Sequence, residues 1–294
     1  VGRCVDHETG NSKGEYVMYV KCLIAAILAL MMMGLTGCSR TVEDVAKWET
    51  SGNVEKLTGA LSDPKVEVRE AALQSLGTLK LESTIDDIAA CFNDADEAVV
   101  LASVNALAAM ESTSTVTPLI AALKLDNPAA NMTAAESLGT LKAPSAVKPL
   151  AERLDSANEE ELLVVITAMG KIGRQAGSRS LVDKLSSSSS ATVRMACIDA
   201  LSATGGSLAL KALVDALSDN DYLIREAAKT ALIKIGDPAI PSIMDGLRSD
   251  DREVRGASVA LLRGLSAVPT EGYALAWYQM ARATTDRNSE IDPE

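Results

Sequence analysis

The chain reads SDPKVEVREAALQSLG at residues 62–77 and SDNDYLIREAAKTALI at residues 218–233. Each stretch begins with a short polar turn and continues with small and apolar residues at helical spacing. In the first stretch these residues fall at i, i+3, i+4, i+7 and i+8, on one face of a helix; they are Val68, Ala71, Ala72, Ser75 and Leu76. Both stretches therefore predict a polar turn followed by an amphipathic helix.

Two ladders of mostly large apolar residues run in phase through the chain, at steps of 30 to 32 residues. The first ladder is Leu76, Leu107, Leu138, Met169, Leu201, Leu232 and Leu262. The second ladder is Leu61, Phe92, Leu123, Leu154, Leu185, Leu217 and Leu247. Self-similarity at a fixed period of this size predicts a stack of repeats, which presents a long surface and no central pocket.

Each repeat is expected to be a helical hairpin. A second helix follows the first, as in VTPLIAAL at residues 116–123, where apolar residues fall at i, i+3, i+4 and i+7. Six glycines follow a first-ladder residue directly or soon after it and are expected to cap the first helices: Gly77, Gly139, Gly170, Gly173, Gly205 and Gly236. The predicted fold is all-α, an α-solenoid of stacked antiparallel hairpins with a period of about 31 residues.

These motifs resemble the HEAT repeat, in the short variety named after phycobilisome lyases, over roughly residues 41–282. In that family an arginine of the first helix usually pairs with an acid of a nearby turn, and Asp63 and Asp219 each precede such an arginine by six residues. The resemblance implies a ladder of ion pairs that keeps the repeats in register. The arginine is present at Arg69, Arg194, Arg225 and Arg255, and is replaced by Val100, Asn131 and Leu162 in repeats two to four.

The front of the chain resembles a bacterial lipoprotein signal peptide. Residues 22–33 are apolar and follow Lys21, as in the h-region of such a peptide, and LTGCS at residues 35–39 resembles a lipobox. We therefore expect a signal peptide at residues 18–37, diacylglycerol and acyl lipid on Cys38, and an over-extended gene start at residues 1–17. The alternative is a transmembrane anchor, but the stretch is short of the usual 20 or so apolar residues and is broken by Gly34 and Gly37.

Three further segments complete the predicted organisation. Residues 38–61 form the lipidated N-terminus and a helical cap, in which TVED at residues 41–44 matches a capping box. Residues 62–282 form the repeats and a C-terminal cap containing Tyr273 and Trp277. The serine run at residues 186–190 is expected to be a flexible loop, and residues 283–294 a disordered tail.

Composition excludes several functions. The one histidine, His7, precedes Cys38, so the processed chain would have no Ser-His-Asp triad and no histidine-ligated metal. The net charge of −12 argues against nucleic-acid binding, which needs a basic face. Cys91 and Cys197 lie more than three repeats apart, too far for a disulfide, and are expected to be buried free thiols; bilin attachment is the alternative. We expect no enzymatic activity, metal or cofactor.

The predicted second helices carry two charged rows. The rows recur at the repeat step and lie four residues apart; they are Lys148, Arg179 and Lys211, and Glu152, Asp183, Asp215 and Asp245. One interpretation is a set of self-neutralising i,i+4 pairs, and the other is a charged surface that binds an extended peptide or another protein.

These observations predict a membrane-anchored bacterial envelope lipoprotein that acts as a non-enzymatic, protein-binding scaffold. The residue after Cys38 is Ser39 rather than Asp, which favours the periplasmic face of an outer membrane where one exists, and otherwise the outer face of the plasma membrane. The alternatives are an accessory subunit of an envelope enzyme or transport complex, a structural spacer, and a protein like the chromophore lyases.

Overall fold

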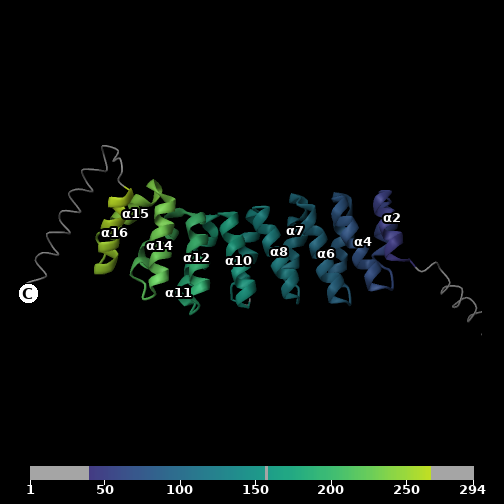
Figure 1. The fold of residues 1–294 in the computed structure, drawn as a ribbon, viewed down its shortest axis with the longest axis horizontal. Helices are drawn as coiled ribbons and strands as arrows, with labels where there is room; N and C mark the ends of the chain where they lie inside the picture. Colours follow the sequence, from purple (N-terminus) through teal and green to yellow (C-terminus); the bar gives the residue numbers. More distant parts are fainter. Residues whose placement is uncertain (1–39, 156–157, 266–294) are drawn as a thin grey trace, which may run out of the picture.

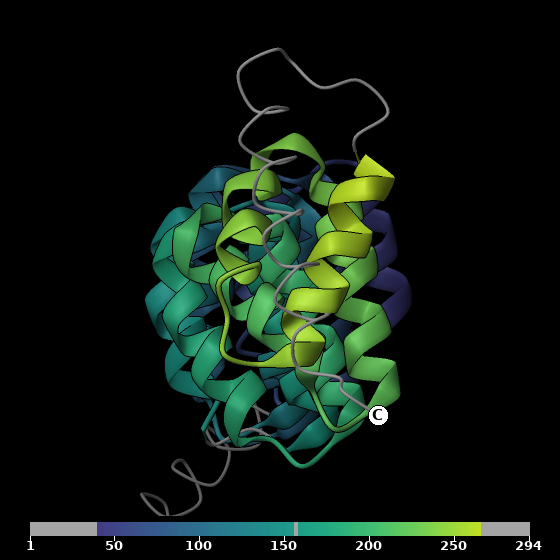
Figure 2. The same cartoon turned by 90° about the vertical axis from the view of Figure 1, so that its left-hand side faces the viewer.

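The computed structural model describes residues 40–155 and 158–265, and every regular element within them is an α-helix or a 3-10 helix. The helices stack side by side into an elongated rod (Figure 1). Viewed down the rod, successive helices lie behind one another in two layers (Figure 2). The predicted all-α solenoid of stacked hairpins is confirmed.

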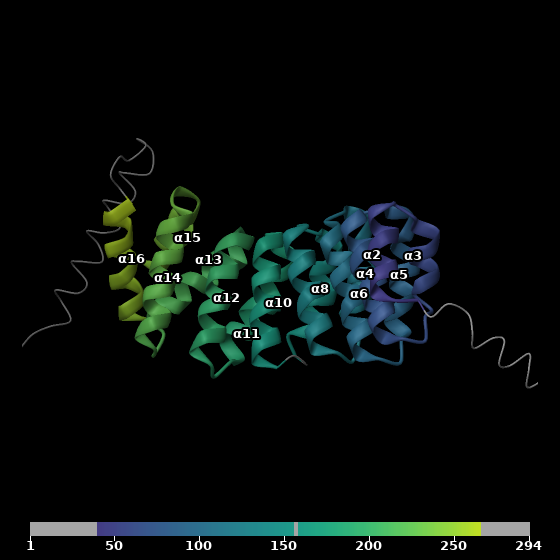
Figure 3. The same ribbon diagram turned by 45° about the vertical axis from the view of Figure 1, so that its right-hand side comes forward.

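One layer holds the first helices, which follow one another along the rod in Figure 3. They are α2 (Val42–Thr50), α4 (Val66–Leu79), α6 (Glu97–Met110), α8 (Pro128–Thr140), α10 (Glu159–Ile172), α12 (Ala191–Thr204), α14 (Tyr222–Ile235) and α16 (Arg252–Leu265). The other layer holds the second helices, which are shorter. They are α3 (Val54–Ala60), α5 (Ile85–Ala90), α7 (Val116–Ala122), α9 (Val147–Arg153), α11 (Ser178–Ser187), α13 (Gly206–Asp215) and α15 (Ile240–Gly246).

Short 3-10 turns connect the two layers. Five of them lead directly into a second helix: η1 (Glu82–Thr84), η3 (Thr113–Thr115), η4 (Pro144–Ala146), η5 (Gln175–Gly177) and η7 (Asp237–Ala239). Two others end a second helix: η2 (Cys91–Asn93) and η6 (Ala216–Ser218). The first turn of α2 carries the predicted capping box, because the Thr41 hydroxyl accepts from the Asp44 N–H at 3.3 Å and the Asp44 carboxylate accepts from the Thr41 N–H at 3.2 Å.

The core is the pair of ladders. Every residue of the first ladder is at most 2% exposed, and the second ladder is buried except for the partly buried Phe92. Burying one such side chain contributes about 1.5–3 kcal/mol relative to leaving it in water. The ladder residues of all the repeats belong to a single hydrophobic cluster, so one continuous core runs along the rod.

The first helices from α4 to α16 end three residues after the first ladder, except α8, which ends two residues after it. The fourth residue after each of the first six ladder residues has a φ between 50° and 71°, at Lys80, Glu111, Lys142, Gly173, Gly205 and Gly236. Glycine adopts this left-handed conformation without strain and commonly ends helices. The predicted capping role is therefore confirmed for Gly173, Gly205 and Gly236.

The prediction was wrong for Gly77, Gly139 and Gly170, which lie inside α4, α8 and α10. A Cβ on these residues would lie 2.8, 2.8 and 3.0 Å from the Cα of Ala106, Ala168 and Ala200 in the next first helix. These three pairs of first helices are also the ones in most extensive contact. The glycines therefore permit close helix packing instead of ending a helix.

The loop predicted at the serine run is shorter than expected and comprises Ser188–Ser190. Ser186 and Ser187 belong to α11, which extends to ten residues. The Ser188 hydroxyl accepts from the Ser190 N–H at 3.2 Å, and the Ser190 hydroxyl accepts from the Val193 N–H at 3.4 Å as the N-cap of α12. Serine is common at such positions because its hydroxyl replaces a backbone acceptor.

In the described part of the chain, no helix combines the length and apolar character needed to cross a lipid bilayer. The predicted signal peptide, the lipidation site Cys38 and the C-terminal aromatic residues lie outside the described residues.

Candidate functional site

The second-helix face carries the two charged rows on α9, α11, α13 and α15. All seven side chains of these rows are exposed. Arg179 and Asp183 of α11 form an ion pair at 3.7 Å, although the two side chains are 77% and 69% exposed. Within the described ranges, no ion pair joins Lys148 to Glu152 or Lys211 to Asp215. Self-neutralisation along a helix therefore accounts for one of the three pairs.

The same rows continue into the N-terminal repeats with different residues. At the positions equivalent to Lys148, α3, α5 and α7 have Glu55, Asp86 and Thr117. At the positions equivalent to Glu152, the same three helices have small exposed residues, namely Gly59, Ala90 and Ala121. The first row therefore changes from acidic to basic along the rod. A search for the repeat step in both directions from Lys148 would have found Glu55 and Asp86 in the sequence.

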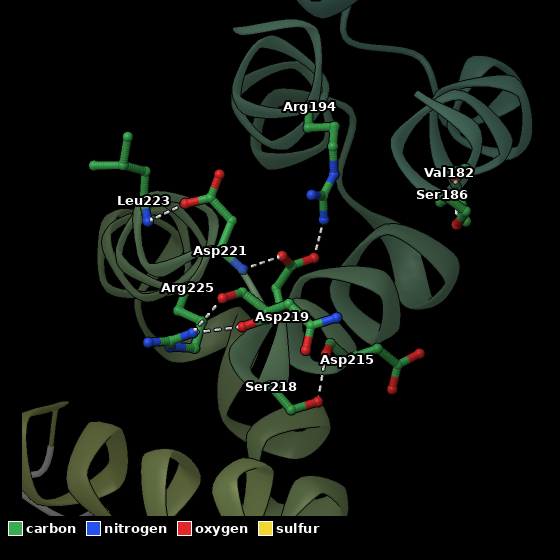
Figure 4. A network of polar contacts seen from close by, with 10 residues as sticks. Val182, Ser186, Arg194, Asp215, Ser218, Asp219, Asp221, Leu223 and Arg225 are labelled. Carbon is green, nitrogen blue, oxygen red and sulfur yellow. Dashed lines mark hydrogen bonds and ion pairs between the residues drawn. The ribbon is translucent and has the colours of Figure 1, made fainter. Parts of the chain in front are cut away.

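A second set of charges lies at the turns between repeats, where Asp219 contacts two arginines (Figure 4). Its carboxylate accepts a hydrogen bond from Arg194 of the preceding first helix. Its backbone carbonyl accepts from Arg225 of the following first helix at 2.6 Å. The acid six residues before an arginine thus binds that arginine through its carbonyl, whereas its carboxylate binds the arginine 25 residues earlier.

The same arrangement occurs around Arg69. This side chain donates to the Asp63 carbonyl at 2.8 Å and to the Asp94 carboxylate at 2.7 Å, and both members of the ion pair are largely buried. Burial acts to raise the pKa of the Asp94 carboxyl, but the hydrogen bonds from Arg69 and from the Asp96 N–H outweigh it and lower that pKa. The hydrogen bond to Asp94 raises the pKa of the Arg69 guanidinium.

In other repeats, different contacts take the place of the ion pair between a first-helix arginine and an aspartate of the next turn. Within the part of the chain that the structure describes, Arg255 donates to the backbone carbonyls of Ser249 and Asp250, at 2.8 and 2.9 Å. Asn131, which stands in place of the arginine, donates its amide to the Leu125 carbonyl at 3.1 Å, six residues before it. At the α9–α10 turn, Arg153 binds Glu161 instead, at 2.8 Å from its Nε. These charges are engaged within the protein, so they are poor candidates for ligand binding.

Cys91 and Cys197 are free and buried. Burial raises the pKa of the Cys91 thiol to about 11 and that of Cys197 to about 12. A thiol must ionise to act as a nucleophile or a metal ligand, so neither is activated for chromophore attachment. Across residues 40–155 and 158–265, no cluster of three histidine, cysteine or acidic residues could hold a metal ion.

Comparison with known families identifies the repeat. A family model described as HEAT repeats matches residues 25–108, 88–170, 154–233 and 178–263. The chain belongs to the HEAT-repeat family. No curated protein matches this HEAT-repeat chain in sequence.

Several solved structures resemble the chain in part. The complex of CpcE and CpcF of phycocyanin lyase from Nostoc sp. is 18% identical, with 79% of this chain and 94% of that chain covered and a TM-score of 0.44. Human deoxyhypusine hydroxylase is 20% identical, with 83% and 98% covered and a TM-score of 0.36. A designed armadillo repeat protein is 18% identical, with 72% and 100% covered and a TM-score of 0.39.

Proposed function

We propose that this HEAT-repeat protein is a non-enzymatic protein-binding module whose second-helix face holds the partner. The observation that carries the proposal is the row of Lys148, Arg179 and Lys211. Packed helices lie about 8–10 Å apart, so the row presents one cation per repeat at that spacing. Lys148 and Lys211 are exposed and have no ion-pair partner in the described structure, which leaves them free to bind carboxylates of a partner.

The acidic row beside it, with Glu152, Asp183 and Asp215, favours a partner that carries both signs of charge. A partner lying along the rod would place acids over the basic row and bases over the acidic row. Such complementarity contributes mainly to specificity and to the rate of association. In the N-terminal repeats, Glu55 and Asp86 reverse the sign of the first row, so the partner would bind in one direction only.

The test compares two double charge reversals. Lys148→Glu with Lys211→Glu alters the second-helix face, and Lys171→Glu with Lys234→Glu makes the same change in charge on exposed positions of the first helices. We expect both variants to keep the wild-type stability to within about 0.5 kcal/mol, because all four positions are exposed. Affinity capture from membranes should lose the partner for the first variant alone. Equal capture by both variants would overturn the proposal.

We further propose that Cys38 tethers the module to a membrane in the cell envelope by covalent lipid. The support is the apolar stretch and LTGCS sequence that precede and contain this cysteine. Two or more acyl chains hold a protein on a bilayer stably, whereas one does so only marginally. Cells fed labelled palmitate should label the wild type and not Cys38→Ala. An unlabelled wild type would refute the tether without affecting the binding proposal.

A further inference from the structure

Large apolar side chains gather on the exposed surface of α14, near the C-terminal end of the described rod (Figure 1). Within residues 40–155 and 158–265, six large apolar residues are exposed. Three of the six belong to α14, namely Tyr222, Leu223 and Ile233, which are 62%, 54% and 57% exposed. At the position of Ile233, the other first helices from α4 to α16 have glycine, alanine, serine or arginine. An exposed apolar cluster of this kind is typical of a contact with another protein.

The residues of this surface follow a symmetrical order. Tyr222, Glu226, Lys229 and Ile233 lie at i, i+4, i+7 and i+11, on one face of α14. Along this face the order is apolar, acidic, basic and apolar. When the face is turned end to end against itself, each apolar residue meets an apolar residue and each charge meets the opposite charge. The face is therefore complementary to an antiparallel copy of itself.

Contacts within α14 hold these side chains in position. The guanidinium of Arg225 lies over the ring of Tyr222, at 5.7 Å from the ring centroid. Lys229 and Glu226 form an ion pair at 2.7 Å, although their side chains remain 36% and 42% exposed. Side chains that are already ordered lose less conformational entropy when a partner binds. The charges of the face are thus both accessible and oriented.

The neighbouring helix leaves room for a second molecule. A groove of about 670 Å³ lies between α14 and α16, and Glu226, Lys229 and Ile233 contribute to its α14 side. On the other side α16 presents Gly256 and Ala260, which are exposed. These small residues allow another helix to approach the charged and apolar face of α14 closely.

We propose that two copies of this protein associate through α14 about a two-fold axis, with the two α14 helices antiparallel. A closed dimer uses the same surface of both copies, which the symmetrical order of the α14 face satisfies. Tyr222 of each copy packs against Ile233 of the second copy, and Glu226 of each faces Lys229 of the second copy. The four charges then alternate in sign around the axis. Because α14 belongs to the first-helix layer, the dimer leaves the second-helix face open and is independent of the partner proposed for that face.

Co-capture of two differently tagged full-length copies, expressed together and solubilised in detergent, tests the dimer. Wild-type copies should capture one another. Glu226→Lys places lysine against lysine across the axis, and Lys229→Glu places acid against acid. Each variant should therefore capture its own kind at least roughly tenfold less well than the wild type does.

The decisive sample combines the two variants. A Glu226→Lys copy and a Lys229→Glu copy have opposite charges at both contacts, so they should capture one another as well as two wild-type copies do. Recovery in this mixed pair also shows that both variants are folded. The matched control is Glu70→Lys, the same substitution at the equivalent position of α4, which should leave capture unchanged.

Four results would overturn the proposal. Absence of capture between wild-type copies would show that α14 does not bind a second copy. Capture that persists between two Glu226→Lys copies would place the contact elsewhere, and a mixed pair that does not recover would exclude the antiparallel register. Loss of co-capture in Lys148→Glu with Lys211→Glu would mean that a partner on the second helices bridges the copies. Retained co-capture in that variant separates the dimer from the binding proposed for the second helices.

Discussion

Gly139→Ala tests the packing of the first helices most directly. A Cβ on Gly139 would lie 2.8 Å from the Cα of Ala168, 3.0 Å from its Cβ and 3.4 Å from its carbonyl oxygen. Carbon atoms in favourable contact are about 3.5–4.0 Å apart, so the new methyl group overlaps backbone atoms by roughly 0.7 Å. A backbone cannot rotate away as a flexible side chain does, so α8 and α10 must separate.

The expected size of the effect follows from two opposing contributions. Inserting a methyl group into a packed interface costs about 1–3 kcal/mol, and contact with a backbone favours the upper end of that range. Alanine is the better helix former by about 1 kcal/mol. The net loss in the free energy of unfolding is therefore about 2 kcal/mol. For a chain of this size, that loss lowers the thermal midpoint by about 4–8 °C.

The assay is urea and thermal unfolding followed by far-ultraviolet circular dichroism. The control is Gly59→Ala in α3, where a Cβ would meet only the guanidinium of Arg40 at 3.8 Å and the protein should gain about 0.5–1 kcal/mol. Opposite signs for the two substitutions support the close approach of α8 and α10. If Gly139→Ala raises the midpoint as Gly59→Ala does, the explanation of the helix-interior glycines is wrong.

Further predictions concern the inter-repeat ion pair and the buried thiols. Asp94→Asn should lower the free energy of unfolding at pH 7, measured in urea, by about 1–3 kcal/mol, because it removes the charge that faces the largely buried Arg69. The control is Asp245→Asn, at an exposed side chain, which should change that free energy by less than about 0.5 kcal/mol. The pKa of Asp94 is lowered in the folded protein, so the stability that the ionised Asp94 contributes is present above its unfolded pKa of about 3.9 and is lost as the pH falls through its folded pKa. The free energies of unfolding of the wild type and Asp94→Asn should therefore converge in acid. With thiol pKa values of about 11 and 12, Cys91 and Cys197 should resist iodoacetamide at pH 8 until urea unfolds the chain, and rapid labelling of either in the native protein would contradict their burial.

The fold could be predicted from the sequence because the apolar residues of the core recur at a nearly constant step along the chain. The ladder through Leu76 and Leu107 fixes which residues face the core, and that information depends only on spacing along the chain. The role of Gly77 depends instead on the distance to the neighbouring helix, which no single repeat reveals. A glycine directly after a ladder residue fits either a helix end or a close contact. The position of the true cap, four residues after the ladder, became clear only from the backbone angles.

The candidate site was predictable to the same degree. The exposed row of Lys148 and Lys211 follows from the repeat step and the helical face. The partner of Arg194 could not be deduced, because the residue six positions before it is Ser188 rather than an acid. Which turn lies beside an arginine depends on how the repeats stack, and the stacking brings Asp219, 25 residues later, to its guanidinium. For Arg69 and Arg225, the sequence distance suggested the carboxylate of the acid six residues earlier, whereas the contact is with that residue's backbone carbonyl.

The charged rows and the first-helix interfaces differ in how strongly the fold constrains their residues. The charged rows occupy exposed positions, which a solenoid leaves free to vary, so their regularity is informative only as a set. Ile233 occupies a position that the stacking restricts to small residues elsewhere, namely Gly77, Ala108, Gly139, Gly170 and Ser202 in the earlier helices. A branched residue there gives up close packing between α14 and α16, and a groove lies between the two helices. A position that the stacking restricts can therefore be judged from the equivalent residues of the other repeats, whereas an exposed charge is informative only as one of a set, such as a row that recurs at the repeat step.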